Sequence, residues 1–263
     1  MIIFIFESKE MQNKPLLILQ ARTGSKRLPN KMTLDFHKGL TIPQIIINNL
    51  KNIFEPNQIV LATSTKKEDD ALEFLANEEG VLLFRGAEND VLQRFIDCAT
   101  LFKAKKIVRI CSDNPFLRPE YIPPLLEKLQ NENLEYTSYQ WKDGTPIMLS
   151  HIGIFAEAMT IDFLKKIKSS TDDSKYLEHV TNYIYYNNKQ FKYAFLPLPE
   201  FLEDRQNVRL TVDTESDFLI AQELYDNIYI KKNSFKLEDL LKLIDENDVI
   251  KSNMEAQIKG NAK

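Results

Sequence analysis

The chain of 263 residues is poor in cysteine and has no excess of positive charge. It contains two cysteines, Cys98 and Cys111, which are too few for a disulfide framework or a cysteine-rich zinc site. Both lie in apolar surroundings, so we expect two core residues and a cytoplasmic protein kept in a reducing environment. The formal net charge is −4, so no overall basic field is available to hold nucleic acid, and any anion must be bound locally.

Long apolar runs are also missing. The N-terminal stretch Met1–Phe6 is apolar but short, has no basic segment before it, and runs into the polar residues Glu7–Glu10. It therefore predicts neither a signal peptide nor a membrane span. Because Met11 could serve as an alternative start, we expect residues 1–14 to form an N-terminal extension.

The polar chemistry begins where the first apolar run ends, at Gln20 and Ala21. The next ten residues hold four cations, one glycine and two small hydroxyl residues, namely Arg22, Thr23, Gly24, Ser25, Lys26, Arg27 and Lys31. Backbone N–H groups and hydroxyls can approach phosphate oxygens where a glycine has no Cβ, while Arg and Lys neutralise charge. A solvated basic loop could have the same composition, so the order of the residues carries the hypothesis of a polyphosphate site.

Strand and helix patterns alternate along the first half of the chain. The expected elements are strands at 16–20, 59–64, 81–84 and 106–111, with helices at 42–54, 68–79, 90–103 and 121–131. This alternation predicts an α/β protein with three layers, in which helices cover both faces of a mostly parallel sheet. Neither Gly-x-Gly-x-x-Gly nor Gly-x-x-x-x-Gly-Lys-Ser/Thr occurs, which disfavours an ordinary dinucleotide fold and a P-loop NTPase.

The second half has a less regular pattern. We expect helices at 157–168, 176–187, 215–227 and 237–247, and strands at 191–198 and 207–212. The main domain should span 15–250, with a smaller α+β lobe at about 135–205 that carries an acceptor pocket or a subunit contact. Residues 251–263 resemble a frayed C-terminal tail.

Polar clusters follow each predicted strand of the first half: Gln20–Lys31, Thr63-Ser64, Arg85–Asp90 and Ser112-Asp113. Such sheets bind ligands at the carboxyl ends of their strands, so these clusters should meet. Asp113 and Asp213 both follow predicted strands and are candidate ligands of Mg²⁺. Each aspartate alone could equally be a turn or helix-cap residue.

Several motifs together resemble one enzyme family. They are Gln20-Ala-Arg-Thr-Gly-Ser-Lys-Arg-Leu-Pro-Asn-Lys31, Phe84-Arg-Gly-Ala-Glu-Asn-Asp-Val-Leu-Gln-Arg-Phe95, Ser112-Asp-Asn-Pro115, Glu178-His-Val-Thr-Asn-Tyr183 and Arg209-Leu-Thr-Val-Asp213. They resemble the cytidylyltransferases that make CMP-activated acidic sugars, above all the SpsF-like branch related to the acylneuraminate and Kdo enzymes. The resemblance covers about residues 16–250.

The resemblance implies a Rossmann-like nucleotidyltransferase fold of the GT-A type and transfer of CMP from CTP to a small-molecule acceptor. It implies Arg22 and Lys31 on the phosphates, with Asp113 and Asp213 as magnesium ligands. These four residues are the candidate catalytic set. The candidate nucleotide contacts are Gln20, Ala21, Arg22, Thr23, Gly24, Ser25, Lys26, Arg27, Lys31, Ala62, Thr63, Ser64, Arg85, Gly86, Asp90 and Ser112.

Two departures leave alternatives open. Ser112 stands where the family usually has glycine, and the segment Ile147–Phe155 contains His151 but no carboxylate. The acceptor, an acidic sugar or a phosphorylated small molecule of surface-polysaccharide synthesis, is therefore less defined than the nucleotide. The alternatives are the same fold with another nucleotide or acceptor, and a non-catalytic nucleotide-binding homologue. Because the lobe is rich in aromatic residues, and because the resemblance to the family implies it, we also expect a homodimer whose subunits contact each other through residues 135–205.

Overall fold

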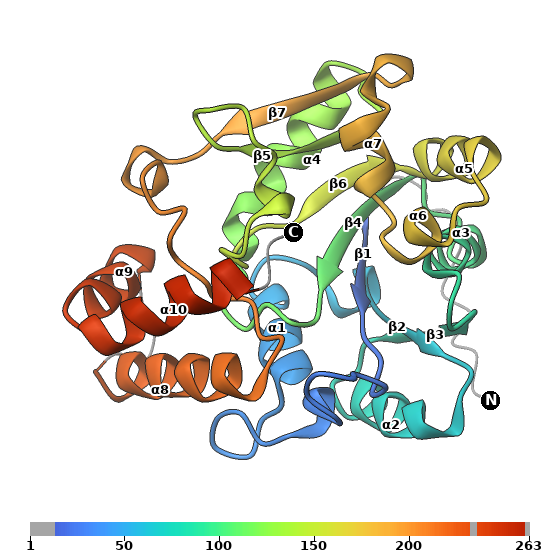
Figure 1. Ribbon diagram of the computed structural model, residues 1–263. Coiled ribbons are helices and arrows are strands. Elements are labelled where there is room, and N and C mark those ends of the chain that lie inside the picture. Colours follow the sequence, from blue (N-terminus) through green and yellow to red (C-terminus); the bar gives the residue numbers. More distant parts are fainter. Residues whose placement is uncertain (1–13, 232–235, 261–263) are drawn as a thin grey trace.

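The computed structural model describes residues 14–231 and 236–260 (Figure 1). Apart from Lys14, the predicted N-terminal extension lies outside the described residues, as do positions 261–263 of the predicted tail. In the part of the chain that is described, no helix is both long enough and apolar enough to cross a membrane.

One mixed sheet forms the middle of the molecule, with the strand order β3-β2-β1-β4-β6-β5-β7. Its strands are β1 (Leu16–Gln20), β2 (Ile59–Ser64), β3 (Leu82–Gly86), β4 (Lys106–Cys111), β5 (Tyr136–Gln140), β6 (Glu157–Thr160) and β7 (Tyr193–Pro197). Strands β1 to β4 pair in parallel, and β6 runs antiparallel to both of its neighbours. The carboxyl ends of β1 to β4 therefore lie along one edge, as expected.

Helices cover both faces of the sheet. They are α1 (Ile42–Leu50), α2 (Asp70–Glu78), α3 (Val91–Leu101), α4 (Ile122–Asn131), α5 (Ile161–Ser170), α6 (Ser174–Glu178), α7 (Asn182–Tyr186), α8 (Glu215–Lys231), α9 (Leu237–Asp245) and α10 (Asp248–Gly260). Leu17 and Leu19 pack in one core cluster with α1, α2, α4 and the C-terminal helices, whereas Leu16 and Ile18 pack in a second cluster with α3 and α5. Alternate residues of a strand face opposite sides, so β1 is buried on both, and the predicted three-layer α/β fold is confirmed.

The helix predicted at 157–168 is partly wrong. Residues 157–160 form strand β6, and the helix begins only after Thr160, whose hydroxyl accepts a hydrogen bond from Phe163 N. Glu157 is fully buried and pairs with Arg109 at 2.5 Å, so the first residues belong to the sheet. The helix predicted at 176–187 is likewise two short helices, α6 and α7, separated by residues 179–181.

Two predictions for the C-terminal part are also corrected. The segment 207–212 is not a strand of the sheet, because its backbone bonds to loops: Leu210 N donates to His151 O, and Val212 N donates to Asp113 O. The supposed tail after residue 250 is helix α10 as far as Gly260. Ile250 and Met254, one turn apart, are buried in the core on which this helix packs.

Candidate nucleotide-binding site

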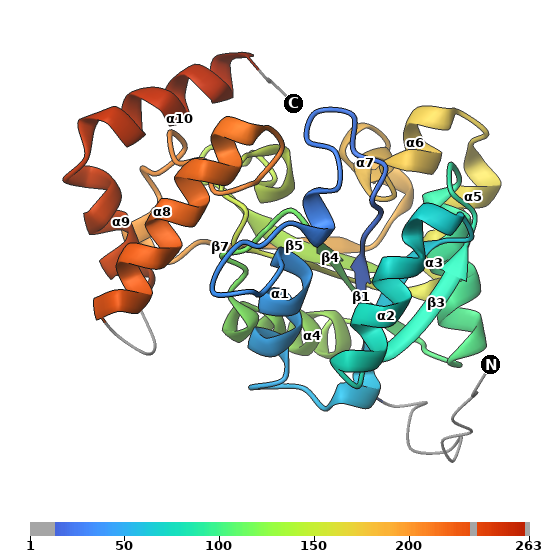
Figure 2. The same ribbon diagram turned by 90° about the horizontal axis from the view of Figure 1, so that it is seen from below.

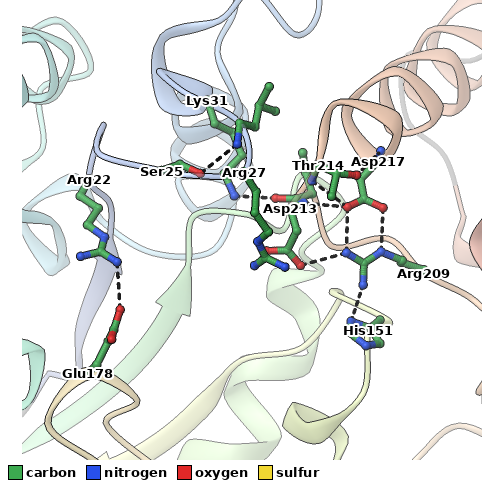
Figure 3. A network of polar contacts seen from close by, with 12 residues as sticks. Arg22, Ser25, Arg27, Lys31, His151, Glu178, Arg209, Asp213, Thr214 and Asp217 are labelled. Carbon is green, nitrogen blue, oxygen red and sulfur yellow. Dashed lines mark hydrogen bonds and ion pairs between the residues drawn. The ribbon is translucent and has the colours of Figure 1, made fainter. Parts of the chain in front are cut away.

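The loop after β1 crosses the carboxyl edge of the sheet. Ala21 N still donates to Ala62 O of β2 at 3.1 Å, and the loop then runs to the short helical turn Lys31–Thr33. Figure 2 shows it between α8 and the segment that holds α6 and α7. Ion pairs tie the loop to both neighbours: Arg22 to Glu178 at 2.9 Å and Arg27 to Asp213 at 2.6 Å (Figure 3).

A buried carboxylate that we did not predict holds the start of this loop. Asp69 Oδ1 accepts from both the backbone N–H and the hydroxyl of Thr23, at 2.8 and 2.7 Å. Asp69 Oδ2 accepts from the backbone N–H and the hydroxyl of Ser64, at 3.2 and 2.5 Å. Burial alone would raise the pKa of Asp69, but these hydrogen bonds outweigh it and lower the pKa below 3.8. One carboxylate thus joins the loop after β1 to the end of β2.

The two predicted metal ligands come from segments about a hundred residues apart that meet through the backbone. Val212 N donates to Asp113 O at 2.8 Å, which places Asp213 beside the end of β4. Lys31, which is buried, donates its Nζ to Val212 O at 2.5 Å. The cationic loop and both aspartates therefore meet at one place on the sheet edge.

Asp213 lies within a network that also caps helix α8 (Figure 3). Arg209 Nη2 donates to Asp213 at 3.0 Å, and its Nε and Nη2 donate to the two carboxylate oxygens of Asp217. Asp217 in turn accepts from the backbone N–H groups of Asp213 and Thr214. Burial opposes the charged form of Asp217, yet Arg209 and these N–H groups lower its pKa. The backbone at Asp213 is thus fixed from two sides.

The residues fit a magnesium ion that is completed by a nucleotide. Asp113 Oδ1 is buried and has no hydrogen-bond partner among the described residues, so it is an available oxygen ligand. Within residues 14–231 and 236–260, no group of three or more His, Cys, Asp or Glu side chains is arranged to hold a metal. Mg²⁺ commonly takes one or two carboxylates together with phosphate oxygens and water, so two aspartates suffice.

Gly153 lies between the two segments that carry the aspartates. A Cβ on this residue would be 2.9 Å from Thr211 N and 3.1 Å from Asn114 Oδ1, and its φ is +62°. The segment Ile147–Phe155, unusual because it has no carboxylate, therefore approaches both aspartate segments too closely for a side chain at 153.

Other predicted contacts are engaged with protein groups. The guanidinium of Arg85 donates to Asp70, to Glu73 and to two backbone carbonyls, one at the last residue of β2 and one in the turn that follows. Asp90 caps α3 by accepting from Gln93 N and pairs with Lys168. Thus Arg85 and Asp90 have evident structural roles, and their contact with a nucleotide stays a prediction, as do the other site assignments. Sequence patterns gave no signal for Asp69, which sits in an ordinary acidic helix start.

A mostly parallel sheet with a cationic loop and two aspartates at its carboxyl edge defines a nucleotide-binding α/β protein. The chain belongs to the cytidylyltransferase family, whose model matches residues 16–253. It is similar to an uncharacterized protein of Methanocaldococcus jannaschii, with 37% identity over 89% of this chain and 92% of that protein. It is similar to the spore coat polysaccharide biosynthesis protein SpsF of Bacillus subtilis, with 31% identity over 81% of this chain and 87% of SpsF.

Among solved structures, a cytidylyltransferase from Leptospira borgpetersenii superimposes with a TM-score of 0.77. It is 28% identical, and the match covers 90% of this chain and 96% of that one. The resemblance proposed from the sequence motifs is therefore confirmed, and so is the enzyme class that it implied.

We expect Asp69→Asn to loosen the loop after β1. The side-chain amide of asparagine has a single acceptor oxygen, so it can accept from the N–H and hydroxyl of Thr23 or from those of Ser64, but not from both. The buried donors left without a partner should lower the free energy of unfolding by about 1–3 kcal/mol. Urea unfolding at neutral pH measures this loss. A carboxylate with a lowered pKa stabilises the folded state only while it is ionised, so the difference from wild type should shrink as the pH falls below 3.8.

The matched control is Asp70→Asn, next in the chain. Asp70 is 57% exposed and pairs with Arg85 at the surface, where an ion pair contributes about 0–1 kcal/mol. Equal losses for the two variants would show that Asp69 does not hold the loop.

We expect Gly153→Ala to be more harmful than Gly144→Ala, although both glycines have positive φ. Each substitution costs about 1–2 kcal/mol of left-handed strain. Only at 153 does the new Cβ also meet backbone atoms, whereas nothing lies within 4 Å at 144. The melting temperature and the rate of turnover should both fall further for Gly153→Ala than for Gly144→Ala. Equal effects of the two substitutions would contradict the close packing of the aspartate segments.

Proposed function

We propose that the chain transfers the CMP group of CTP to an acidic sugar or a phosphorylated small-molecule acceptor and releases pyrophosphate. The observation that carries this proposal is the hydrogen bond from Val212 N to Asp113 O, which brings both aspartates beside the cationic loop. A basic loop alone could bind any polyphosphate, and two carboxylates alone could bind any divalent cation. Their meeting at one edge suits a nucleoside triphosphate with its metal.

The cations of the loop act on the phosphates. Arg22 and Arg27 pair with Glu178 and Asp213 when no ligand is bound, and both side chains are substantially exposed. Phosphate oxygens can replace these carboxylates, after which the guanidinium groups neutralise the leaving pyrophosphate. The acceptor oxygen attacks the α-phosphorus in line, and the work of the protein is to position the groups and balance their charge.

Asp113 and Asp213 are the residues that would hold Mg²⁺. A bound magnesium ion would supply charge neutralisation for phosphate oxygens during the transfer. Asp213 is held by Arg209 even when Arg27 leaves, so its carboxylate stays near the loop while the phosphates bind.

The similarity to SpsF supports an acceptor that belongs to surface-polysaccharide synthesis. The same residues would also serve another nucleotide or another acceptor, because the loop contacts described above recognise phosphate and not a base. Substrate assays separate these outcomes from a homologue that binds a nucleotide without turnover.

The lobe at 135–205 remains our candidate for a homodimer contact. It carries β7 at the edge of the sheet, and Tyr186 and Phe201 are 63% and 37% exposed. Edge strands and exposed aromatic side chains are each usual places for association. Light scattering at micromolar concentration should give twice the chain mass, and a monomeric mass would contradict the proposal.

We expect pyrophosphate release with CTP, Mg²⁺ and one acceptor from a panel of acidic sugars and phosphorylated small molecules. EDTA should abolish it, and Asp213→Ala should reduce turnover by at least about 100-fold, since a ligand of the metal that stabilises the transition state is lost. Circular dichroism should show an intact fold. Asp172→Ala, an exposed aspartate, is the control and should have wild-type turnover.

The results distinguish the alternatives. Near-normal turnover of Asp213→Ala would remove this residue from the metal site. A thermal shift with CTP but no release with any acceptor would favour a nucleotide-binding homologue. A larger shift and faster release with UTP, GTP or ATP would overturn the choice of CTP.

A further inference from the structure

The short helices α6 and α7 form one unit beside the cationic loop, which we call the arm (residues 174–186; Figure 2). Ring contacts join the two helices. Tyr176 of α6 lies edge-on to Tyr183 of α7, with ring centroids 5.1 Å apart, and Lys175 Nζ lies 5.3 Å from the ring centroid of Tyr186. No residue of α6 is buried. The position of α6 therefore depends on where the rest of the arm is attached.

The α6 end of the arm holds one cation of the loop. Glu178, the last residue of α6, is 49% exposed and pairs with Arg22 at 2.9 Å (Figure 3). This carboxylate and a phosphate compete for the same guanidinium. Its negative charge also repels a phosphate that approaches Arg22. Glu178 in this position therefore opposes the binding of any polyphosphate that uses Arg22.

The middle of the arm is fixed to a buried carboxylate. Glu157, which is fully buried, accepts a hydrogen bond from the hydroxyl of Thr181 at 3.1 Å. It also accepts from Arg109 Nη1 at 2.5 Å and from Tyr136 OH at 2.9 Å. The hydroxyl of Tyr185 in α7 adds a second attachment, 2.9 Å from that of Tyr136. Thr181 is 1% exposed and donates to a charged acceptor, so its bond is a strong attachment of the arm.

Thr181 follows Glu178 by three residues, so the chain between them spans at most about 11 Å. The anchor therefore limits how far Glu178 can move from the loop. We propose that Thr181 is a positioning residue: through its bond to Glu157 it holds Glu178 against Arg22 and so lowers the affinity of the loop for polyphosphate. This inference rests on the proposed function, in which the loop binds the phosphates of the nucleotide.

The buried carboxylate does not need Thr181 for its own charge balance. Arg109 already neutralises Glu157, and Tyr136 supplies another donor. The hydroxyl of Thr181 thus serves the arm more than the sheet. Its consequence is for the end of the reaction, because product release limits turnover in many enzymes. A carboxylate that returns to Arg22 would help pyrophosphate to leave.

The first test compares pyrophosphate binding by the unaltered chain and by Glu178→Gln in titration calorimetry. Glutamine keeps the shape of the side chain and removes its charge. An exposed ion pair is equivalent to a change of up to about fivefold in a binding constant. We therefore expect Glu178→Gln to bind pyrophosphate about two- to fivefold more tightly. The matched control is Glu132→Gln on α4, because Glu132 is also 49% exposed and pairs with Lys128; its affinity should be unchanged.

The second test asks whether Thr181 acts through Glu178. Thr181→Val removes the hydroxyl and keeps the shape, so it should tighten pyrophosphate binding as Glu178→Gln does. Thr181→Ser keeps the hydroxyl and should bind as the unaltered chain. In the Glu178→Gln background, Thr181→Val should have no further effect, because substitutions within one network are not additive. Thr100→Val, which removes an exposed hydroxyl from α3, is the control and should change nothing.

Two results would overturn the inference. Equal pyrophosphate affinity of Glu178→Gln and the unaltered chain would remove the competition for Arg22. Additive effects of the substitutions at 178 and 181 would show that Thr181 is only structural. If circular dichroism shows that Thr181→Val does not fold, Tyr185→Phe removes the second attachment and replaces it in the same cycle.

The proposed function is tested separately by the unaltered chain. Absence of both CTP and pyrophosphate binding would contradict that function itself. Binding by the unaltered chain, with either of the two overturning results, would leave the function intact and reject only the role of the arm.

Discussion

The site depends on one point of contact between two distant parts of the backbone. Asp113 follows β4 within the parallel half of the sheet, whereas Asp213 precedes α8 in the C-terminal part of the chain. The hydrogen bond from Val212 N to Asp113 O joins them, and Gly153 fills the space beside both segments without a side chain. Asp217 and Arg209 then fix the backbone at Asp213 from the helix side. A small displacement here would separate the two carboxylates, and two carboxylates that lie apart cannot share one metal.

Charge balance is the second constraint on the site. Without ligand, the cations of the loop pair with carboxylates: Arg27 with Asp213, and Arg22 with Glu178. These pairs are partly exposed, so water and salt weaken them, and phosphate oxygens can replace the carboxylates at little cost. In the function proposed above, the loop would thus stay folded without a ligand and release its cations to a triphosphate.

Buried polar groups divide into those that support the fold and those that the fold leaves unsatisfied. Asp69 receives four hydrogen bonds and joins the loop after β1 to the end of β2, and Arg109 is neutralised by Glu157 within the sheet. Asp113 Oδ1, just after β4, has no hydrogen-bond partner in the part of the chain that the structure describes. Since folding alone gains nothing from an unsatisfied buried group, Asp113 Oδ1 is the atom that supports the metal ion of the proposed function.

The sequence by itself determined the first four strands, their helices and the edge on which the polar residues meet, because short apolar runs and amphipathic spacing are local signals. It also determined the family, through the order of residues from Gln20 to Lys31. It could not separate β6 from α5, since Glu157 is in a strand only because Arg109 and Tyr136 lie across from it.

The tertiary structure decided what each polar residue does. Arg85 is turned toward Asp70 and Glu73, and Asp69, unremarkable in sequence, became the carboxylate that holds the loop. The segment 207–212 looked like a strand, yet its backbone bonds to loops of the site and not to the sheet. These outcomes depend on which groups meet across long sequence separations, and hydrophobic periodicity contains no information about the partners of a polar side chain.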